Sequence, residues 1–234
     1  MSSSTAGPHH AGLQQHPILP VTSADRGDVG SGPLRLALVR HGQTTANAQG
    51  VLDTRPPGRP LTEEGHRQAA ELAQRLADEP VVAVYASRAL RAQQTAQPIA
   101  ARHGLAVLTL DGVHEAFIGD LEGHQTPEAH RSLHALYRAW HSGDLEAART
   151  GGESGKQVLD RYLADVAAIR SAHRHGTAVL VSHGAAIRLA VVALATNIDG
   201  SFAEPRYLAN GATVLLEADP TGWHCVRWGD MELD

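Results

Sequence analysis

The residues of this chain best suited to chemistry are Arg40, His41 and Gly42, which follow the apolar run 34–39. They place a guanidinium beside an imidazole at the point where a buried strand is expected to give way to a loop. In open α/β folds, ligands bind at the carboxyl ends of the strands. There, an arginine can hold a phosphate group and a histidine can act as a nucleophile. So short a motif indicates a site only if other parts of the chain supply partners.

Three other expected strand ends carry such partners. Ser87 and Arg91 follow one strand, Glu115 comes shortly after another, and His183 follows a third. Because strand ends in a doubly wound sheet meet at one edge, two histidines, two arginines and a carboxylate are predicted to converge on one pocket.

The predicted pocket suits attack by a histidine on phosphorus. Imidazole attacks only in its neutral form, and nearby guanidiniums lower the pKa of a histidine. Arg40 and Arg91 would favour neutral His41 while they neutralise the phosphate oxygens. His183 can donate to a phosphate oxygen, and a dianionic substrate is expected to favour its protonated form, the opposite of the effect on His41.

The leaving oxygen also needs a proton, and the residues alone leave its donor open. The candidate carboxyl groups are those of Glu115, Asp120, Glu122 and Glu153. A neighbouring phosphate and partial burial would keep such a group protonated.

Thr44 and Asn47 offer a hydroxyl and an amide close to His41. Both suit hydrogen bonding to a phosphate or orientation of the loop. For Asn47 a turn or helix-cap role is an equal alternative, because asparagine readily bonds to local backbone.

The elements that must position these residues alternate between short apolar runs and helical patterns. The runs predict strands at 34–40, 81–86, 106–110, 177–182 and 212–217. Between them, Thr62, Thr126 and Ser154 are predicted N-caps of helices. Another helix is expected from about Arg88, with Leu90, Thr95 and Ile99 inward, and a buried one over 185–194. This order is typical of an α/β fold with a mainly parallel central sheet.

Chain length and composition indicate how many domains the chain forms. The 234 residues, 42% of them hydrophobic, suffice for one sizeable domain, which we expect over 33–234. Residues 1–32 are rich in Ser, Gly and Pro and predict a disordered extension, with a docking arm as the alternative.

The formal charge of -5 and pI near 6.3 favour neither nucleic acid nor an anionic membrane as partner. With no signal-peptide pattern and no long apolar run, a cytoplasmic protein is expected.

The cysteine and histidine residues indicate whether the chain could bind a metal. Cys225 is the single cysteine, which excludes a multi-cysteine zinc site. His130 and His134 have the spacing of two ligands on one helix face, but they lack the Glu of the His-Glu-x-x-His pattern. We therefore expect a polar helix face there and no metal or other cofactor.

The ordered motifs resemble the histidine phosphatase superfamily, in its phosphoglycerate-mutase-like group. They are Leu38-Val39-Arg40-His41-Gly42-Gln43-Thr44 with Asn47, Leu61-Thr62 with Gly65, Ser87 to Ala96, Glu115 with Gly119 and Glu122-Gly123, Gly152-Glu153-Ser154, and Ser182-His183-Gly184. The resemblance implies a three-layer α/β sandwich in which His41 becomes a phosphohistidine. It assigns Arg40, Arg91 and His183 to the phosphate pocket and Glu115 as proton donor.

By the same resemblance the chain would be a metal-independent phosphomonoesterase acting on small phosphate esters. A phosphoglycerate mutase and a non-catalytic phospho-ligand binding protein are the alternatives. Mutases of this group are longer between the catalytic carboxylate and the Gly-Glu-Ser turn and carry more basic residues there. Here 123–151 offers only Arg131, Arg138 and Arg149, which favours water as the phosphoryl acceptor. Oligomeric state stays open, with a homodimer as one alternative.

The proline-rich loop 51–60 departs from the pattern of many relatives. Its stiffness is expected to fix one wall of the substrate pocket. Arg55 or Arg59 is predicted to contact an acidic tail of the substrate, because both lie between the nucleophile and Leu61.

Overall fold

Strand β1 (Arg35–Arg40) lies in the middle of a sheet whose order, in the residues that the computed structural model describes (32–234), is β3-β2-β4-β1-β5-β6-β7. The other strands are β2 (Val81–Ser87), β3 (Val107–Leu110), β4 (Thr177–Ser182), β5 (Thr213–Ala218), β6 (Trp223–Trp228) and β7 (Met231–Glu232). Strands β1 to β4 are mutually parallel, whereas β5, β6 and β7 pair antiparallel. The prediction of an α/β fold with a mainly parallel sheet is confirmed. The extension predicted for 1–32 lies, apart from Gly32, outside the described residues.

All the predicted strands form, and β6 and β7 were missed. In β6, Trp223, Cys225 and Trp228 are buried, but His224 and Arg227 interrupt the apolar pattern that would have marked it. β6 is instead held as the hairpin partner of β5.

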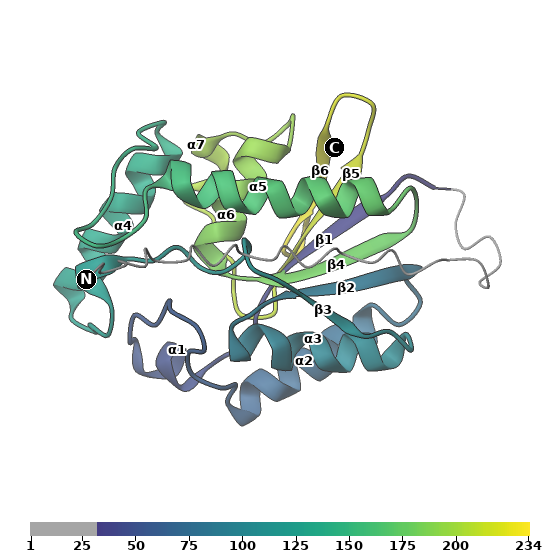
Figure 1. Cartoon of the computed structure of the whole chain (residues 1–234), viewed down its shortest axis with the longest axis horizontal. Coiled ribbons are helices and arrows are strands. Elements are labelled where there is room, and N and C mark those ends of the chain that lie inside the picture. Colours follow the sequence, from purple (N-terminus) through teal and green to yellow (C-terminus); the bar gives the residue numbers. More distant parts are fainter. Residues whose placement is uncertain (1–31) are drawn as a thin grey trace, which may run out of the picture.

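The helices cover both faces of the sheet (Figure 1). They are α1 (Thr45–Gln49), α2 (Glu63–Arg75), α3 (Leu90–Arg102), α4 (Pro127–His141), α5 (Gly155–Ala172), α6 (Gly184–Leu194) and α7 (Gly200–Ala203). The predicted caps are present, since the side chains of Thr62, Thr126 and Ser154 each accept an N–H from the first turn of their helix. None of the described helices is long and apolar enough to cross a membrane.

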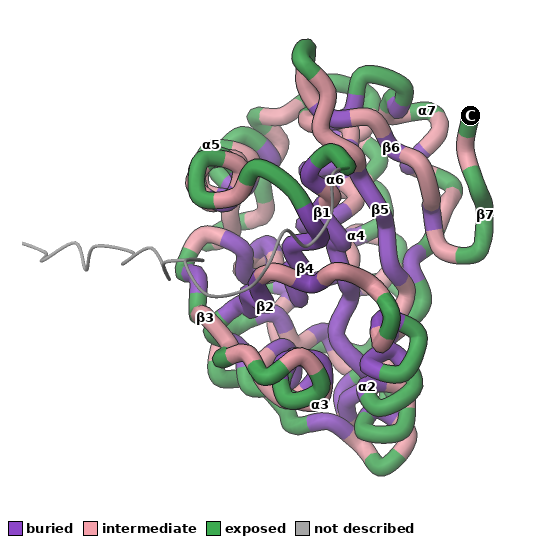
Figure 2. Tube along the Cα trace, turned by 90° about the vertical axis from the view of Figure 1, so that its right-hand side faces the viewer, coloured by how far each residue is buried: buried purple, intermediate pink, exposed green. Residues whose placement is uncertain are grey.

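Alternating strand residues build two cores, one on each face. Val39, Val84 and Val181 pack under α2 and α3, while Leu38, Tyr85 and Leu180 belong to the larger core beneath α5 and α6. Figure 2 shows the central strands as a buried layer between helices with exposed outer turns. The result is a three-layer sandwich with β1 and β4 buried on both sides.

One inward residue was predicted wrongly. Leu90 is 39% exposed because it is the first residue of α3, off the buried face of that helix. Thr95 and Ile99 are fully buried as predicted, together with Arg91, whose long side chain runs toward the ends of the strands.

Candidate active site

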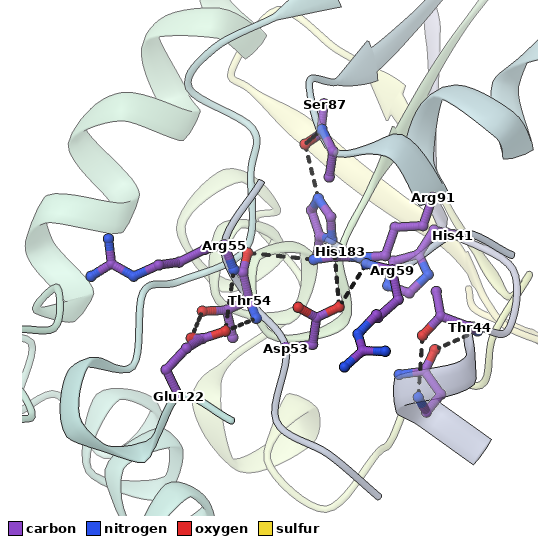
Figure 3. A network of polar contacts seen from close by, with 12 residues as sticks. His41, Thr44, Asp53, Thr54, Arg55, Arg59, Ser87, Arg91, Glu122 and His183 are labelled. Carbon is purple, nitrogen blue, oxygen red and sulfur yellow. Dashed lines mark hydrogen bonds and ion pairs between the residues drawn. The ribbon is translucent and has the colours of Figure 1, made fainter. Parts of the chain in front are cut away.

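The structure brings the predicted residues together at the carboxyl ends of the parallel strands. His41 follows β1 and His183 follows β4, and their ring centroids are 5.2 Å apart. A cavity of about 310 Å³ opens beside them, lined in part by Arg40, His41, Arg91 and Glu115. His183 lies against His41 and Ser87 (Figure 3) and is not among the described residues that line the cavity.

Two features prepare His41 to attack. Its Nδ1 donates to the carbonyl of Gly42 at 2.7 Å, so the lone pair of the neutral ring is on Nε2. Burial, then the charges of Arg91 and Arg40, hold the pKa of His41 well below its ordinary value. The predicted effect of the arginines is present, but burial is the larger cause. The ring is therefore neutral at neutral pH.

The pKa of His183 moves in the same direction. Burial, followed by Arg91 and His41, lowers the pKa of His183 well below its ordinary value. In the protein itself the two histidines therefore shift in the same direction, because both rings are almost fully buried beside the same arginine. The effect of a dianionic substrate on His183 stays a prediction. His183 Nε2 lies 2.9 Å from the Ser87 hydroxyl, while Nδ1 is buried with no hydrogen-bond partner among the described residues.

The lowered pKa of His41 predicts a titration that NMR can follow. Since the charged form is disfavoured, His41 should stay neutral as the pH falls through 6.5 and should protonate only at distinctly lower pH. Arg91→Gln should raise the pKa but leave it depressed, because burial contributes more than Arg91. Imidazole ¹⁵N shifts give both values. A wild-type His41 that titrates near 6.5 would contradict the buried environment described here.

Each of the two arginines has one buried nitrogen without a hydrogen bond to a described residue, while another of its nitrogens is bonded. Arg40 Nη1 donates to the carbonyl of Leu208 at 2.5 Å and to the Tyr207 hydroxyl, and Arg91 Nη2 donates to the carbonyl of Thr54 at 3.4 Å. Arg40 Nε and Arg91 Nη1 are buried without a hydrogen bond to any described residue. Buried donors are nearly always paired in native proteins. With His183 Nδ1, they make a cluster that suits a tetrahedral oxyanion.

Glu115 is held at the cavity by backbone N–H groups. Its Oε1 accepts from Ala116 and Ala186, both at 3.0 Å, and its Oε2 accepts from Ala185 at 3.1 Å. Two of these donors belong to the first turn of α6. The carboxyl group therefore has a fixed direction beside the cavity that it lines.

The competing carboxylates are engaged elsewhere. Glu122 accepts from the N–H and hydroxyl of Thr54 at 2.7 and 2.5 Å. Glu153 forms a double hydrogen bond with Arg161, each contact 2.8 Å, and Asp120 pairs with Arg149 at 2.9 Å. None of the three lines the cavity in the described part of the chain. Their bonds give them structural roles, whereas Glu115 is the one carboxyl group of the four that lines the cavity in the described residues.

Thr44 and Asn47 are used to start a helix. They form a capping box for α1: Thr44 Oγ1 accepts from Asn47 N–H at 3.1 Å, and Asn47 Oδ1 accepts from Thr44 N–H at 3.0 Å. Asn47 therefore has the helix-cap role that was predicted as one of its two alternatives. Asn47 also lines the cavity, whereas Thr44 is buried away from it.

The structure does not support the predicted contact of Arg55 with an acidic substrate tail, and for Arg59 that contact stays a prediction. Neither residue is among the described residues that line the cavity. The Arg55 guanidinium lies 4.9 Å from the centre of the Phe117 ring, and Figure 3 shows its side chain pointing away from His41 and Arg91. A cation–π contact therefore fixes its direction.

Loop 51–60 instead packs on Arg91. Asp53 Oδ2 lies 3.8 Å from Arg91 Nη1, and a Cβ added at Gly58 would come within 2.2 Å of the same nitrogen. Gly58 also has a φ of +68°, which favours glycine. Loop 51–60 thus packs against, and limits the position of, a buried arginine that lines the cavity.

Gly58→Ala is therefore expected to lower activity through Arg91. The added methyl group must displace a guanidinium that is 2% exposed, so kcat/KM should fall by about tenfold, part of the loss seen when an oxyanion donor is removed. Gly104→Ala is the matched control, because Gly104 has a similar φ of +64° and nothing within 4 Å of an added Cβ. Steady-state kinetics and melting temperatures decide: equal kcat/KM values for the two variants would show that the loop does not position Arg91.

The two helix histidines line the same cavity. His130 Nε2 donates to the carbonyl of Gly50 at 2.8 Å. One ring nitrogen of the first of the two histidines considered for a metal is therefore already engaged. Together with Tyr137 they occupy one face of α4, at positions i, i+4 and i+7. The polar face expected there is present, and it forms part of the cavity wall.

Several further lining residues were not predicted as site residues. They are Gln43, Asp53, Thr54, Tyr137, Arg188, Tyr207 and Asn210. The spacing of Tyr137 from His130 and His134 is the one signal that could have identified a cavity-facing stripe. Tyr207 and Asn210 lie in an irregular segment with no such periodicity.

This geometry agrees with the comparisons with known proteins. Residues 36–231 match the histidine phosphatase superfamily (branch 1), and the chain belongs to that family. The resemblance inferred from the motifs is thereby confirmed.

Individual relatives are phosphatases or mutase-like proteins. The chain is 36% identical over 204 residues to phosphoglycerate mutase-like protein 4 of Arabidopsis thaliana, covering 84% of this chain and 85% of that protein. It is 35% identical over 157 residues to a metal-independent phosphoserine phosphatase of the same organism, covering 65% of each. A solved structure of mycobacterial glucosyl-3-phosphoglycerate phosphatase, complexed with VO3, is similar with a TM-score of 0.73 and 25% identity, covering 84% of this chain and 99% of that one.

Proposed function

We propose that the chain is a phosphomonoesterase that hydrolyses small phosphorylated metabolites through a phosphohistidine on His41, with Glu115 as proton donor. One observation carries the proposal. Arg40, Arg91 and His183 each have a buried donor that makes no hydrogen bond to a described residue, and they lie around a neutral imidazole whose Nε2 has a free lone pair. Phosphatases among the relatives support hydrolysis as the reaction class.

In the first step Nε2 of His41 attacks phosphorus. The new N–P bond forms as the ester P–O bond breaks, and Glu115 gives its proton to the leaving oxygen. Arg40, Arg91 and His183 Nδ1–H donate to the phosphoryl oxygens, whose charge must be stabilised as the bond order changes. Ser87 supports this arrangement when its hydroxyl donates to His183 Nε2 and leaves the proton of that ring on Nδ1.

In the second step Glu115, now ionised, takes a proton from water. The water oxygen attacks phosphorus as the N–P bond breaks, and inorganic phosphate leaves. His41 returns to its neutral form and Glu115 to its protonated form. No other group has to supply a proton or an electron pair.

The arginines of 123–151 favour water over a second phosphorylated acid as the acceptor. Arg138 pairs with Glu204 at 3.2 Å and Arg149 with Asp120, and Arg131 is exposed. None of them lines the cavity in the described residues. This favours hydrolysis over the mutase alternative.

A panel of phosphate esters, assayed by release of inorganic phosphate, tests the proposed function. Turnover of at least one small ester, with no rate loss after EDTA treatment, is expected. If no ester is hydrolysed, the phosphomonoesterase proposal fails. A strong loss with EDTA would replace the histidine mechanism by a metal-assisted one.

A further inference from the structure

Polar side chains of α4 and α6 also line the cavity that Glu115 lines. Tyr137 projects from α4 and Arg188 from α6, and both line the cavity together with Glu115. The phosphoryl group would occupy the end with Arg40 and Arg91, on the His41 side. Since Glu115 protonates the leaving oxygen, the rest of the leaving group must lie toward Tyr137 and Arg188.

Arg188 is a half-buried cation that forms no ion pair within 4.0 Å in the described structure, although the charges of Glu204 and Glu115 act on it from farther away. Its Nε and Nη2 donate to the carbonyl of Ala203 at 3.2 and 2.9 Å, and Nη2 also donates to the carbonyl of Glu204. No carboxylate of the described residues lies within 4.0 Å of its guanidinium, and the Glu204 side chain pairs with Arg138 instead. Nη1 makes no hydrogen bond to the described protein. Burial lowers the pKa of Arg188, as expected for a desolvated cation, but an arginine stays charged at neutral pH.

Tyr137 adds a neutral donor at the same place. Burial and then the charge of Glu115 raise the pKa of Tyr137 well above its ordinary value, so the phenol keeps its proton. Its hydroxyl makes no hydrogen bond to a described residue. The ring is packed against Trp140, with centroids 5.2 Å apart, which limits its movement. A fixed O–H donor thus accompanies a cation that has no direct ion-pair partner among the described residues.

We propose that Arg188 and Tyr137 form a subsite for a carboxylate on the leaving group, so that the preferred substrates are phosphate esters of small hydroxy acids. The inference rests on the proposed function. A carboxylate supplies the direct ion-pair partner that Arg188 lacks among the described residues, and one oxygen can accept from Nη1 while the other accepts from the phenol. A neutral hydroxyl would satisfy the donors but leave the guanidinium without that partner.

Matched ester pairs that differ in the carboxylate test this subsite. 3-Phosphoglycerate is compared with glycerol 3-phosphate, and phosphoserine with phosphoethanolamine. For the wild-type protein we expect kcat/KM to favour the acid of at least one pair by about tenfold or more, which corresponds to about 1.4 kcal/mol of additional transition-state binding. If both members of each pair are hydrolysed equally well, the subsite is wrong and the phosphatase function stands. If neither member of any pair nor any other ester is hydrolysed, the function itself fails.

Variants then connect the preference to the two residues. Arg188→Gln and Tyr137→Phe should each shrink the acid-to-neutral ratio, chiefly through a higher KM for the acid, and Arg188→Lys should restore part of the ratio. Arg131→Gln, an exposed arginine on α4, is the control and should keep the wild-type ratio. Tyr137→Phe keeps the ring that packs on Trp140, so it answers the question even if Arg188→Gln loosens the segment at Ala203. An unchanged ratio in both Tyr137→Phe and a folded Arg188 variant would overturn the proposal.

Discussion

Replacing His41 with alanine is expected to abolish turnover and, with it, any phosphorylated form of the protein. The substitution removes His41 Nε2, a nitrogen with a free lone pair that lies at the cavity wall beside donors with no hydrogen bond to a described residue. Removal of a nucleophile that acts as part of a catalytic unit typically costs about 10⁴-fold or more in kcat. Phosphate release measures the first loss, and acid-quenched against alkali-quenched labelling measures the second, since an N–P bond survives alkali but not acid.

His124→Ala is the control for this experiment. His124 is exposed and away from the cavity, so its loss should leave both readouts unchanged. Phosphatase activity that survives in His41→Ala would show that another group attacks phosphorus. An acid-stable label in the wild-type protein would point to an oxygen nucleophile instead.

The parts of the site carried by regular elements were predictable from the sequence. Arg40, His41 and His183 directly follow apolar runs that form β1 and β4, so the strand periodicity alone placed them at one edge of the sheet. The carboxyl group of the site was harder to predict, because the sequence offers four candidates and Glu115 is one of them. The choice among them follows from hydrogen bonds between distant segments, such as Glu122 with Thr54, which no local pattern encodes.

Side-chain direction in irregular segments was the part that could not be predicted. Arg55 lies where a substrate-facing residue was expected, yet its guanidinium packs on the ring of Phe117, a residue far along the chain. In the same way Arg40 is held by Tyr207 and Leu208, which lie in an irregular segment before β5. A helix or strand has a period that predicts which face a residue occupies. A loop has none, so its contacts must be seen in three dimensions.

Glu115→Gln is expected to separate the two chemical roles of that carboxyl group. An amide is similar in size but cannot protonate the leaving oxygen, so kcat/KM for an alkyl phosphate ester should fall by about 10³-fold, within the range of general acid catalysis. 4-Nitrophenyl phosphate should lose far less, because its leaving group departs as a stable anion. Water is no longer activated in the variant, so a phosphohistidine should accumulate and appear as a burst of 4-nitrophenol.

The same variant distinguishes catalysis from a structural role. Glu115 accepts N–H groups from Ala185 and Ala186 at the start of α6, and an amide retains only part of that acceptor capacity. If the carboxyl group served chiefly to hold this helix end beside His183, both esters would lose activity by the same factor and no burst would appear. Glu128→Gln, an exposed residue in the first turn of α4, controls for the loss of one negative charge. A loss that depends on the leaving group can arise only if Glu115 takes part in the bond-breaking step, and an accumulated phosphoenzyme only if it also activates the water that ends the cycle.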